Sequence, residues 1–185
     1  MPFELQPTIE NAWIRLEPLE GGDFDALYAV ASDPKIWEQH PNKTRHQRDV
    51  FATYFKGAIA SGGAFRVLDK ASGALIGSSR YYDFDEPGCT IAVGYTFIAR
   101  DRWGGKYNGA LKSLMLDHAF KFVDRVIFHI GVDNLRSRRA MEKIGGVYAG
   151  DIAVAYYGEP GQRNAIYEIE AAAWAASRAA GLVAG

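Results

Sequence analysis

The sequence is poor in cysteine, in long apolar runs and in net charge. Its single cysteine, Cys89, excludes an intrachain disulfide, as is typical of cytoplasmic chains. We expect Cys89 to be a small, partly buried hydrophobic side chain rather than a reactive thiol. No run reaches the roughly 18 apolar residues of a transmembrane helix, and the segment 1–4 lacks the basic-then-apolar pattern of a secretory signal. These absences predict a soluble, cytoplasmic protein with no membrane partner.

An excess of charge of one sign is also missing. The 21 Lys and Arg residues nearly balance the 22 Asp and Glu residues, and the formal net charge is −1. This balance disfavours a general nucleic-acid binder, which needs a strongly basic surface. The four histidines show no metal-ligand spacing, and one cysteine cannot complete a thiolate site. We therefore expect no metal and no nucleic-acid partner.

The 185 residues suffice for a single domain, 1–185, and no linker, repeat or low-complexity tract divides them. Apolar alternation and turn signals predict strands at 14–19, 64–68, 75–82, 90–98, 126–132, 147–155 and 165–169. Helical patterns predict helices at 24–31, 47–60, 107–123, 135–144 and from 171 onward. Antiparallel hairpins followed by a β-α-β-α-β half indicate an α/β (α+β) domain. We expect a mixed, mainly antiparallel sheet of about seven strands flanked by helices.

A basic, glycine-containing turn precedes the helix predicted at 107–123. Gly104 and Gly105 let the backbone approach a ligand closely, and the free amides of a helix start attract anions. Arg100, Arg102 and Lys106 add cations to the same turn. This pattern indicates a phosphate-binding turn, although an ordinary tight turn has a similar composition.

The next predicted helix also begins with basic residues. Asp133 or Asn134 is the expected N-cap, and Arg136, Arg138 and Arg139 follow closely. Cations oppose the helix dipole at this end, by roughly 0.3–1 kcal/mol each when exposed. Either a bound polyanion offsets the repulsion, or the arginines reach away to solvent and carboxylates. The sequence leaves both explanations open.

Five motifs, spread over nearly the whole chain, have a recognisable spacing. In chain order they are Ile14–Leu19, Ile76–Tyr81, Val93–Phe97, Trp103–Asn108 with Lys112, and Asp133–Gly145. Together they resemble the GNAT acyl-CoA N-acyltransferase superfamily, and within it the RimJ/RimL-like branch of ribosomal-protein N-terminal acetyltransferases. The resemblance implies that the fourth and fifth predicted strands splay apart and that acetyl-CoA binds between them. It also implies an acceptor side at 1–63, an acyl-CoA core at 64–146, and C-terminal strands and a helix at 147–185.

The resemblance, together with the two basic helix starts, assigns site residues. The catalytic positions are Asn134 and Ser137, and the latter is a candidate donor to, or orienter of, the CoA thiolate. An equally good interpretation is that the Ser137 hydroxyl caps the backbone at the helix start. The expected cofactor-binding positions, several of them through the backbone, are Tyr95, Phe97, Ile98, Arg102, Trp103, Gly104, Gly105, Lys106, Tyr107, Asn108, Asn134 and Arg139.

The sequence departs from the family pattern in its phosphate-binding turn. Trp103 stands at the family's basic position, and Lys106 stands at its central glycine. One accommodation is a shifted turn in which Gly105 takes the special backbone conformation. The other is that Lys106 itself reaches a phosphate.

A second departure concerns the general base. Many members of this branch carry a glutamate two positions before the Gly-Tyr of the fourth strand, where this chain has Ala92. Another group, or water acting on an amine whose pKa is lowered by burial, would then have to accept the proton. The candidate bases are Glu38, Asp83, Asp85, Glu86 and His129.

These observations predict an N-acetyltransferase that moves an acetyl group directly from acetyl-CoA to a primary amine, without a metal. The alternative is a catalytically weak acyl-CoA-binding or sensing protein, because Ala92 and Lys106 are unusual. Transfer of a longer acyl group is an intermediate possibility. A peptide N-terminus, a ribosomal protein, a polyamine and an aminoglycoside are all open as acceptors, and the resemblance makes a homodimer plausible.

Overall fold

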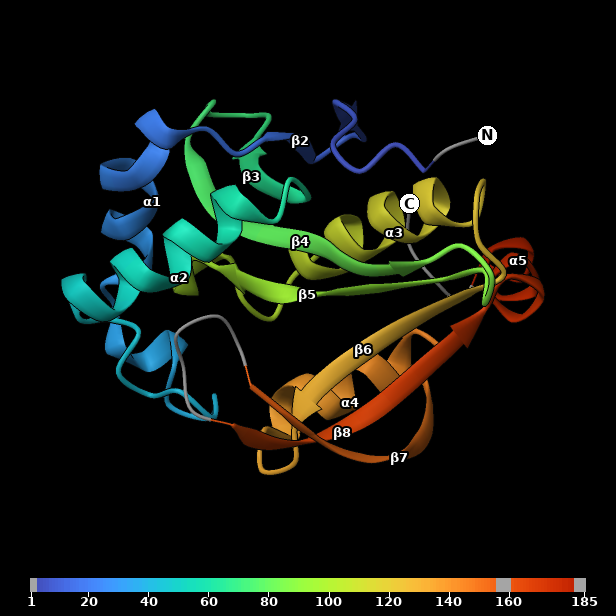
Figure 1. Ribbon diagram of the computed structural model, residues 1–185. Helices are drawn as coiled ribbons and strands as arrows, with labels where there is room; N and C mark the ends of the chain where they lie inside the picture. The colour runs from blue at the N-terminus through green and yellow to red at the C-terminus, as the bar shows by residue number, and fades with distance from the viewer. Residues whose placement is uncertain (1–2, 156–160, 182–185) are drawn as a thin grey trace.

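The computed structural model describes residues 3–155 and 161–181, and one mixed sheet runs through them (Figure 1). Its eight strands are β1 (Ile9–Glu10), β2 (Ile14–Pro18), β3 (Ala64–Asp69), β4 (Leu75–Asp85), β5 (Thr90–Ile98), β6 (Arg125–Gly131), β7 (Val147–Val154) and β8 (Gln162–Glu170). They lie in the order β1-β2-β3-β4-β5-β6-β8-β7, and among these described strands only β5 and β6 are parallel neighbours. The predicted mixed, mainly antiparallel sheet is confirmed. It has one strand more than expected because the short β1 pairs with β2.

Helices cover both faces of this sheet. In the described part of the chain they are α1 (Phe24–Ala31), α2 (Arg48–Ala60), α3 (Tyr107–Ala119), α4 (Leu135–Lys143) and α5 (Ala171–Ala179). One buried cluster joins α3, α4 and α5 to the sheet, and a second joins α1 and α2 to the opposite face. None of these described helices is long and apolar enough to cross a membrane.

A β-bulge interrupts the middle of β5. The register against β4 shifts by one residue at Tyr95 and Thr96, which together lie opposite Ser79. Tyr95 has a φ of 53°, a left-handed conformation that costs a non-glycine residue about 1–3 kcal/mol. Because the extra residue reverses the alternation of side chains beyond it, Thr96 faces α3, whereas Tyr95 and Phe97 face α2.

Strands β5 and β6 are paired only along their first residues. The described ladder joins Thr90, Ile91 and Ala92 to the segment Arg125–Ile127 and then ends. Beyond this point the two strands diverge, and β6 continues to pair with β8 (Figure 1). The predicted splaying of the fourth and fifth strands is therefore confirmed. From Val93 onward, β5 has one edge without a neighbouring strand.

Several element boundaries differ from the prediction by one to four residues. The helix predicted at 107–123 ends at Ala119, because the amides of Phe122 and Val123 bond back to the Ala119 carbonyl and turn the chain inward. This turn buries Val123 in the core. The strand predicted to begin at 165 begins instead at Gln162, which pairs with Val154 of β7.

The expectation of a partly buried Cys89 is wrong. Cys89 is exposed in the turn between β4 and β5. Its φ of 49° belongs to the left-handed region, as does the φ of Asp83 in the same hairpin. The tight turn holds the Cys89 side chain away from the core.

Gly77 tests how closely β4 and β5 approach each other below the bulge. A Cβ added there would lie 2.1 Å from the Phe97 carbonyl oxygen, so Gly77→Ala must shift one backbone against the other. We expect a loss of about 1–3 kcal/mol in the free energy of unfolding, measured by chemical denaturation. Gly109 in α3 is the matched control, because a Cβ there meets nothing within 4 Å. Gly109→Ala should be neutral or stabilise by about 0.5–1 kcal/mol. Equal losses in both variants would contradict the packing argument.

Candidate active site

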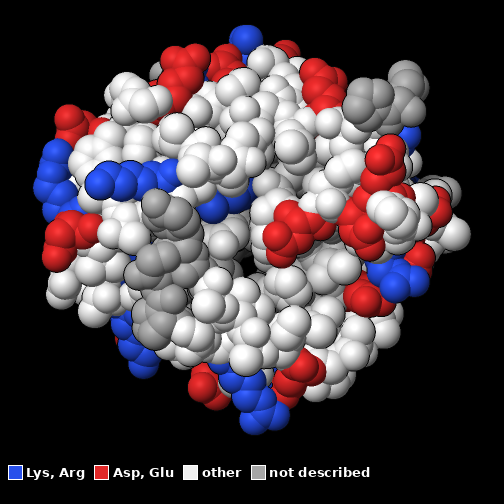
Figure 2. Space-filling view, viewed as in Figure 1, with Lys and Arg blue, Asp and Glu red and all other residues white. Residues whose placement is uncertain are grey.

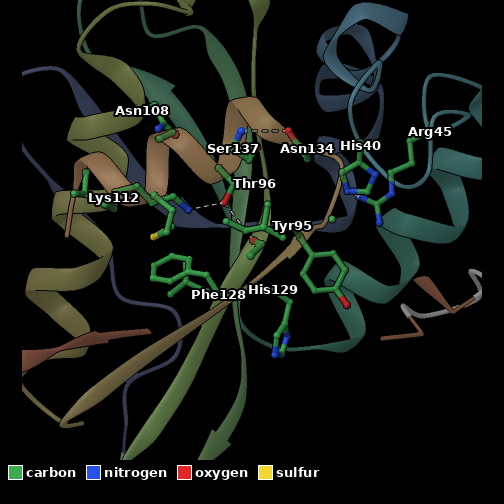
Figure 3. A pocket seen from close by; sticks show the side chains of 17 residues that line it. His40, Arg45, Tyr95, Thr96, Asn108, Lys112, Phe128, His129, Asn134 and Ser137 are labelled. Atoms are coloured by element: carbon green, nitrogen blue, oxygen red, sulfur yellow. Dashed lines mark hydrogen bonds between the residues drawn. The ribbon is translucent and has the colours of Figure 1, made fainter. Parts of the chain in front are cut away.

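A pocket opens where β5 and β6 diverge (Figure 3). It is lined by β5, β6, α3, α4 and the segment before α2, and measures about 790 Å³ including its solvent-open part. In Figure 2 a hollow lies near the middle of the visible face, with basic atoms on one side and acidic groups on the other. The lining residues labelled in Figure 3 are His40, Arg45, Tyr95, Thr96, Asn108, Lys112, Phe128, His129, Asn134 and Ser137.

The turn before α3 presents free backbone amides. The amides of residues 104–109 donate to no acceptor among the residues that the structure describes. Gly104 has a φ of 72°, and neither Gly104 nor Gly105 has another atom within 4 Å of a built Cβ. The special conformation expected for Gly105 thus belongs to Gly104. The turn is open and suited to close backbone contact with an anion.

The side chains of this turn bind to the protein itself. Arg102 pairs with Asp69 at 3.3 Å, and the Tyr107 hydroxyl donates to the same carboxylate at 3.3 Å. The Lys106 ammonium lies 2.9 Å from the centre of the Trp13 ring. Lys106 is therefore directed to the β1–β2 loop, rather than towards the phosphate position that was the second expectation. The groups of this turn that are available to a ligand are therefore chiefly its backbone amides.

Trp103 links the two helix starts. Its indole N–H donates to the Ile98 carbonyl oxygen at 2.9 Å, which ties the turn to the end of β5. The Arg136 guanidinium lies 4.0 Å from the Trp103 ring centre and also donates to the Ile36 carbonyl oxygen. Trp103 therefore connects the turn before α3 to the end of β5 and to the start of α4.

The arginines of α4 mostly have partners within the protein. Arg138 donates to the Tyr167 hydroxyl and to the Val132 carbonyl oxygen. With Arg136 stacked on Trp103, two of the three cations are explained by intramolecular contacts, so the arginines reach away from the helix axis. Arg139 is exposed and makes no ion pair with the described residues.

Asn134 and Ser137 lie in the pocket wall, as Figure 3 shows. Asn134 is the N-cap of α4, and its Oδ1 accepts the Ser137 amide at 3.2 Å. The Asn134 side chain is almost fully buried, whereas Ser137 is half-buried. The cap leaves the Asn134 Nδ2 group and the Ser137 hydroxyl without a hydrogen-bond partner among the described residues.

The expected β5 positions contribute differently. The Phe97 side chain is buried against Trp37 on the α2 side, so only its backbone faces a ligand. The Tyr95 carbonyl oxygen already accepts from the Tyr54 hydroxyl at 2.9 Å, and Ile98 is bonded by Trp103. Two backbone carbonyl groups of β5, those of Tyr95 at the bulge and Ile98 at the end, are therefore already hydrogen-bonded within the protein.

The sequence grouped Lys112 with the phosphate-binding turn, but the structure places its side chain in the pocket beside Thr96. It lies one turn after Asn108 on α3, is 7% exposed, and points into the pocket (Figure 3). Its ammonium donates to Thr96 Oγ1 at 3.1 Å and lies 5.1 Å from the Phe128 ring centre. Burial lowers the pKa of Lys112 from 10.5 to about 8. The four-residue spacing from Asn108 was the available sequence signal, since positions i and i+4 share a helix face.

Of the candidate bases, only His129 lines the pocket. Its Nδ1 lies 3.1 Å from the Tyr82 hydroxyl, and burial lowers the pKa of His129 below 6.5, with Asp83 partly opposing the shift. His129 is thus neutral near pH 7. Ala92 is buried at the last rung of the β5–β6 ladder. The other candidates are exposed and outside the lining: Glu38, Asp83, Asp85 and Glu86.

Two buried arginines that sequence reasoning missed lie on the α2 side of the sheet. Arg45 precedes α2 and lines the pocket, and Arg80 lies on β4. The Arg45 Nη1 lies 3.1 Å from His40 Nε2. Burial, followed by the charge of Arg45, lowers the pKa of His40 well below 6.5, so this imidazole is neutral. A charged residue inside the apolar pattern of a central strand was the available signal for Arg80.

The described residues hold no group of three or more His, Cys, Asp or Glu side chains arranged to bind a metal ion.

Solved structures with the same fold include several acetyltransferases. A GCN5-related N-acetyltransferase from Brucella melitensis superposes with a TM-score of 0.82 at 23% identity, over 97% of this chain and 85% of that one. RimJ from Mycobacterium smegmatis, solved with CoA-disulfide, gives a TM-score of 0.66 at 19% identity, over 91% and 89%. A spermidine N-acetyltransferase from Vibrio cholerae, solved with CoA and spermine, gives 0.67 at 18%, over 89% and 99%. At these identities the likeness concerns the fold.

Sequence comparison gives the family directly. No curated protein matches this chain. A family model described as an acetyltransferase (GNAT) domain matches residues 14–147, which is more than half of the chain. This match includes the bulged β5, the open turn before α3 and the Asn134 cap of α4. The chain therefore belongs to the GNAT acetyltransferase family.

Proposed function

We propose that the protein is an N-acyltransferase of the RimJ/RimL-like branch that transfers an acetyl group from acetyl-CoA to a primary amine. The observation that carries the proposal is the free edge of β5, which lies between the open turn of α3 and the start of α4. The single domain, the cytoplasmic location and the homodimer stay predictions.

The described groups fit the parts of acetyl-CoA. The free amides of residues 104–109 suit the pyrophosphate, because unpaired helix-start amides bind anionic oxygens. The amide-containing pantetheine arm can pair with the edge of β5 as an added strand would. The Asn134 Nδ2 group supplies a further donor beside that edge. Acetyl-CoA brings the reactive thioester, and the protein supplies orientation and polar groups.

A few pocket residues can take part in proton transfer. The attacking amine must be neutral, and His129, which is itself neutral near pH 7, is a lining residue able to accept its proton directly or through water. Ser137 is assigned to orient, or donate a proton to, the departing thiolate. Backbone amides of β5 near the bulge are assigned to polarise the thioester carbonyl.

Lys112 places a positive charge in the same pocket without a carboxylate among the described residues. A buried ammonium interacts more strongly with developing negative charge than an exposed one, because the local dielectric is low. We assign Lys112 to stabilising negative charge on the thioester as its carbon–sulfur bond breaks. Thr96, at the bulge, fixes the position of the ammonium.

The first experiment is calorimetric titration of the purified, nucleotide-free protein with acetyl-CoA, and with dephospho-CoA for comparison. Micromolar binding that weakens without the 3′-phosphate is expected, because Arg139 at the start of α4 is exposed, makes no ion pair with the described residues and can interact with phosphate charge. If neither compound gives heat of binding or a thermal shift, the proposal that the protein is an acyltransferase is contradicted.

Variants of α4 separate binding from chemistry. Asn134→Ala should weaken acetyl-CoA binding and turnover together, and should also cost about 1 kcal/mol of stability because the cap is lost. Asn134→Asp keeps the capping oxygen and loses the donor, so it isolates the ligand contact. Ser137→Ala should lower kcat with binding largely kept. An unchanged kcat in Ser137→Ala would take this hydroxyl out of the reaction.

Lys112→Met should make the protein more stable near neutral pH and less active. The folded-state pKa of about 8 lies below the usual lysine value of 10.5, so the unfolded chain binds more protons between these values and wild-type stability rises with pH there. The gain in the free energy of unfolding should approach about 3 kcal/mol near pH 7 and shrink towards pH 10. Denaturation at both pH values measures it, with Lys56→Met, an exposed lysine of α2, as the control. A pH-independent destabilisation would argue against a buried, penalised charge.

A second candidate function follows from Ala92. Ala92 is buried at the last pair of the β5–β6 ladder. Many members of this branch have a glutamate at this position, so this chain lacks that carboxylate. A protein that binds acetyl-CoA tightly and acylates no amine of a broad panel would be an acyl-CoA sensor. Acyl-chain profiling with longer thioesters separates this outcome from a different acyl preference.

A further inference from the structure

Two guanidinium groups lie buried around the same pair of phenol rings beside the pocket. Arg80 is 4% exposed, and its Cζ lies 3.9 Å from the Tyr95 ring centre and 5.6 Å from that of Tyr54. Arg45 is 1% exposed, and its Cζ lies 4.9 Å and 6.0 Å from the Tyr54 and Tyr95 ring centres. Arg45 and Tyr95 line the pocket on the side towards α2, which we call its acceptor side, and Arg80 packs on the Tyr95 ring without lining the pocket itself.

Arg80 is short of partners. Its Nε and Nη2 atoms are buried and donate to no acceptor among the described residues, and it makes no ion pair with them. The Tyr95 ring face offsets part of the desolvation of this cation. The penalty for burying an unpaired charge is larger than this gain. Burial, with repulsion from Arg45 adding to it, lowers the pKa of the Arg80 guanidinium. An anion bound beside Arg80 would remove this imbalance.

Negative charge acts on the neighbouring part of the same site. Asp83, at the end of β4, opposes the lowering of the His129 pKa and adds to the raising of the Tyr95 pKa, which burial causes in the first place. Asp83 is exposed and therefore available to attract an ammonium group from solvent. The acceptor side thus combines buried positive charge near α2 with negative charge near His129.

We propose that the acceptor is an amine that also carries a carboxylate, as a free amino acid does, and that Arg80 and Arg45 bind this carboxylate. The inference rests on the proposed function, because it identifies the molecule whose amine is acylated. The acyl carbon leaves sulfur and bonds to the amine nitrogen, the amine loses one proton, and the thiolate gains one. The carboxylate is unchanged in this step and serves only for binding.

The same charges disfavour polycations. The buried Arg80 guanidinium, which makes no ion pair with the described residues, would repel a polyamine or an aminoglycoside, whose charges are all positive. A planar carboxylate, in contrast, matches the guanidinium fork with two parallel hydrogen bonds. The chain should therefore differ from its structural neighbour that acts on spermidine.

The test compares matched acceptors in the presence of acetyl-CoA. L-amino acids are paired with their amides and with the corresponding decarboxylated amines, and spermidine is added to the panel. Release of CoA thiol and the mass of the product report transfer. We expect kcat/KM for amino acids to exceed that for the amides at least about tenfold, because a site built for a polar group rejects the analogue that lacks it. A preference for amides, amines or spermidine would overturn the proposal.

Arg80→Met and Arg80→Lys locate the preference. Arg80→Met should remove the discrimination between acid and amide and leave kcat/KM for the amide unchanged or higher. Arg80→Lys should keep part of the discrimination between acid and amide, because lysine keeps the positive charge but lacks the two parallel N–H donors of a guanidinium. Arg15→Met, at an exposed arginine of β2, is the control and should behave as wild type. Equal loss for all acceptors in Arg80→Met would mean that Arg80 has a structural role only.

A measurement without turnover keeps this inference separate from the proposed function. N-acetylglycine and its amide are titrated in thermal-shift experiments at constant ionic strength, with wild type and Arg80→Met. The acid alone should raise the wild-type Tm, and the shift should vanish in Arg80→Met, whose own Tm should equal or exceed that of wild type. No selective shift would overturn the carboxylate site, even if acetyl-CoA binds and amines are acylated. Absence of acetyl-CoA binding would instead overturn the proposed function.

The carboxylate could also belong to the acyl donor. Succinyl-CoA with a neutral amine acceptor tests that source directly. Arg80-dependent transfer from succinyl-CoA, without a preference among acceptors, would place the anion on the donor and overturn the proposal in its stated form.

Discussion

The single extra residue in β5 is the constraint on which the rest of the site depends. Without the bulge at Tyr95 and Thr96, the side chains beyond it would occupy the opposite faces of the sheet. Thr96 could then not meet Lys112, and Phe97 could not fill the cluster beneath α2. The bulge is held by the Tyr54 hydroxyl on the Tyr95 carbonyl and by the contact between Ser79 and Thr96 at 2.8 Å. A local irregularity thus sets which groups face each half of the pocket.

Three positively charged side chains are buried in or next to the pocket. Lys112 and Arg45 line the pocket and Arg80 packs on the Tyr95 ring next to it, and all three are largely shielded from solvent. Side chains of this kind are seldom fully buried unless they are paired, and Arg80, which makes no ion pair with the described residues, should lower the stability of the fold. Proteins commonly tolerate such costs where binding or chemistry requires them. We propose different tasks for these positive groups: Lys112 would act on the thioester, and Arg45 and Arg80 would act on the acceptor.

The sequence predicted the fold well and the site partly. Strand alternation and turn residues identified the main elements, since those signals are local. The end of α3 was misplaced because the inward turn after Ala119 depends on tertiary burial of Val123. The Asn134 cap was predicted as one of two choices and is confirmed. The roles of Arg102 and Lys106 depended on where Asp69 and Trp13 lie in space, which no local pattern encodes. The ligand assignments themselves stay predictions.

Asp69 connects a distant hairpin to the turn before α3. This nearly inaccessible carboxylate accepts from Ser72 within the β3–β4 hairpin and from Tyr107 at the start of α3, and it pairs with Arg102. The hairpin tip is thereby part of the support of a turn from which it is separated by more than 30 positions along the chain. A random mutagenesis screen for altered CoA affinity should accordingly recover substitutions in this surface hairpin. Loop grafting between relatives would succeed more often when the hairpin and the turn are exchanged together.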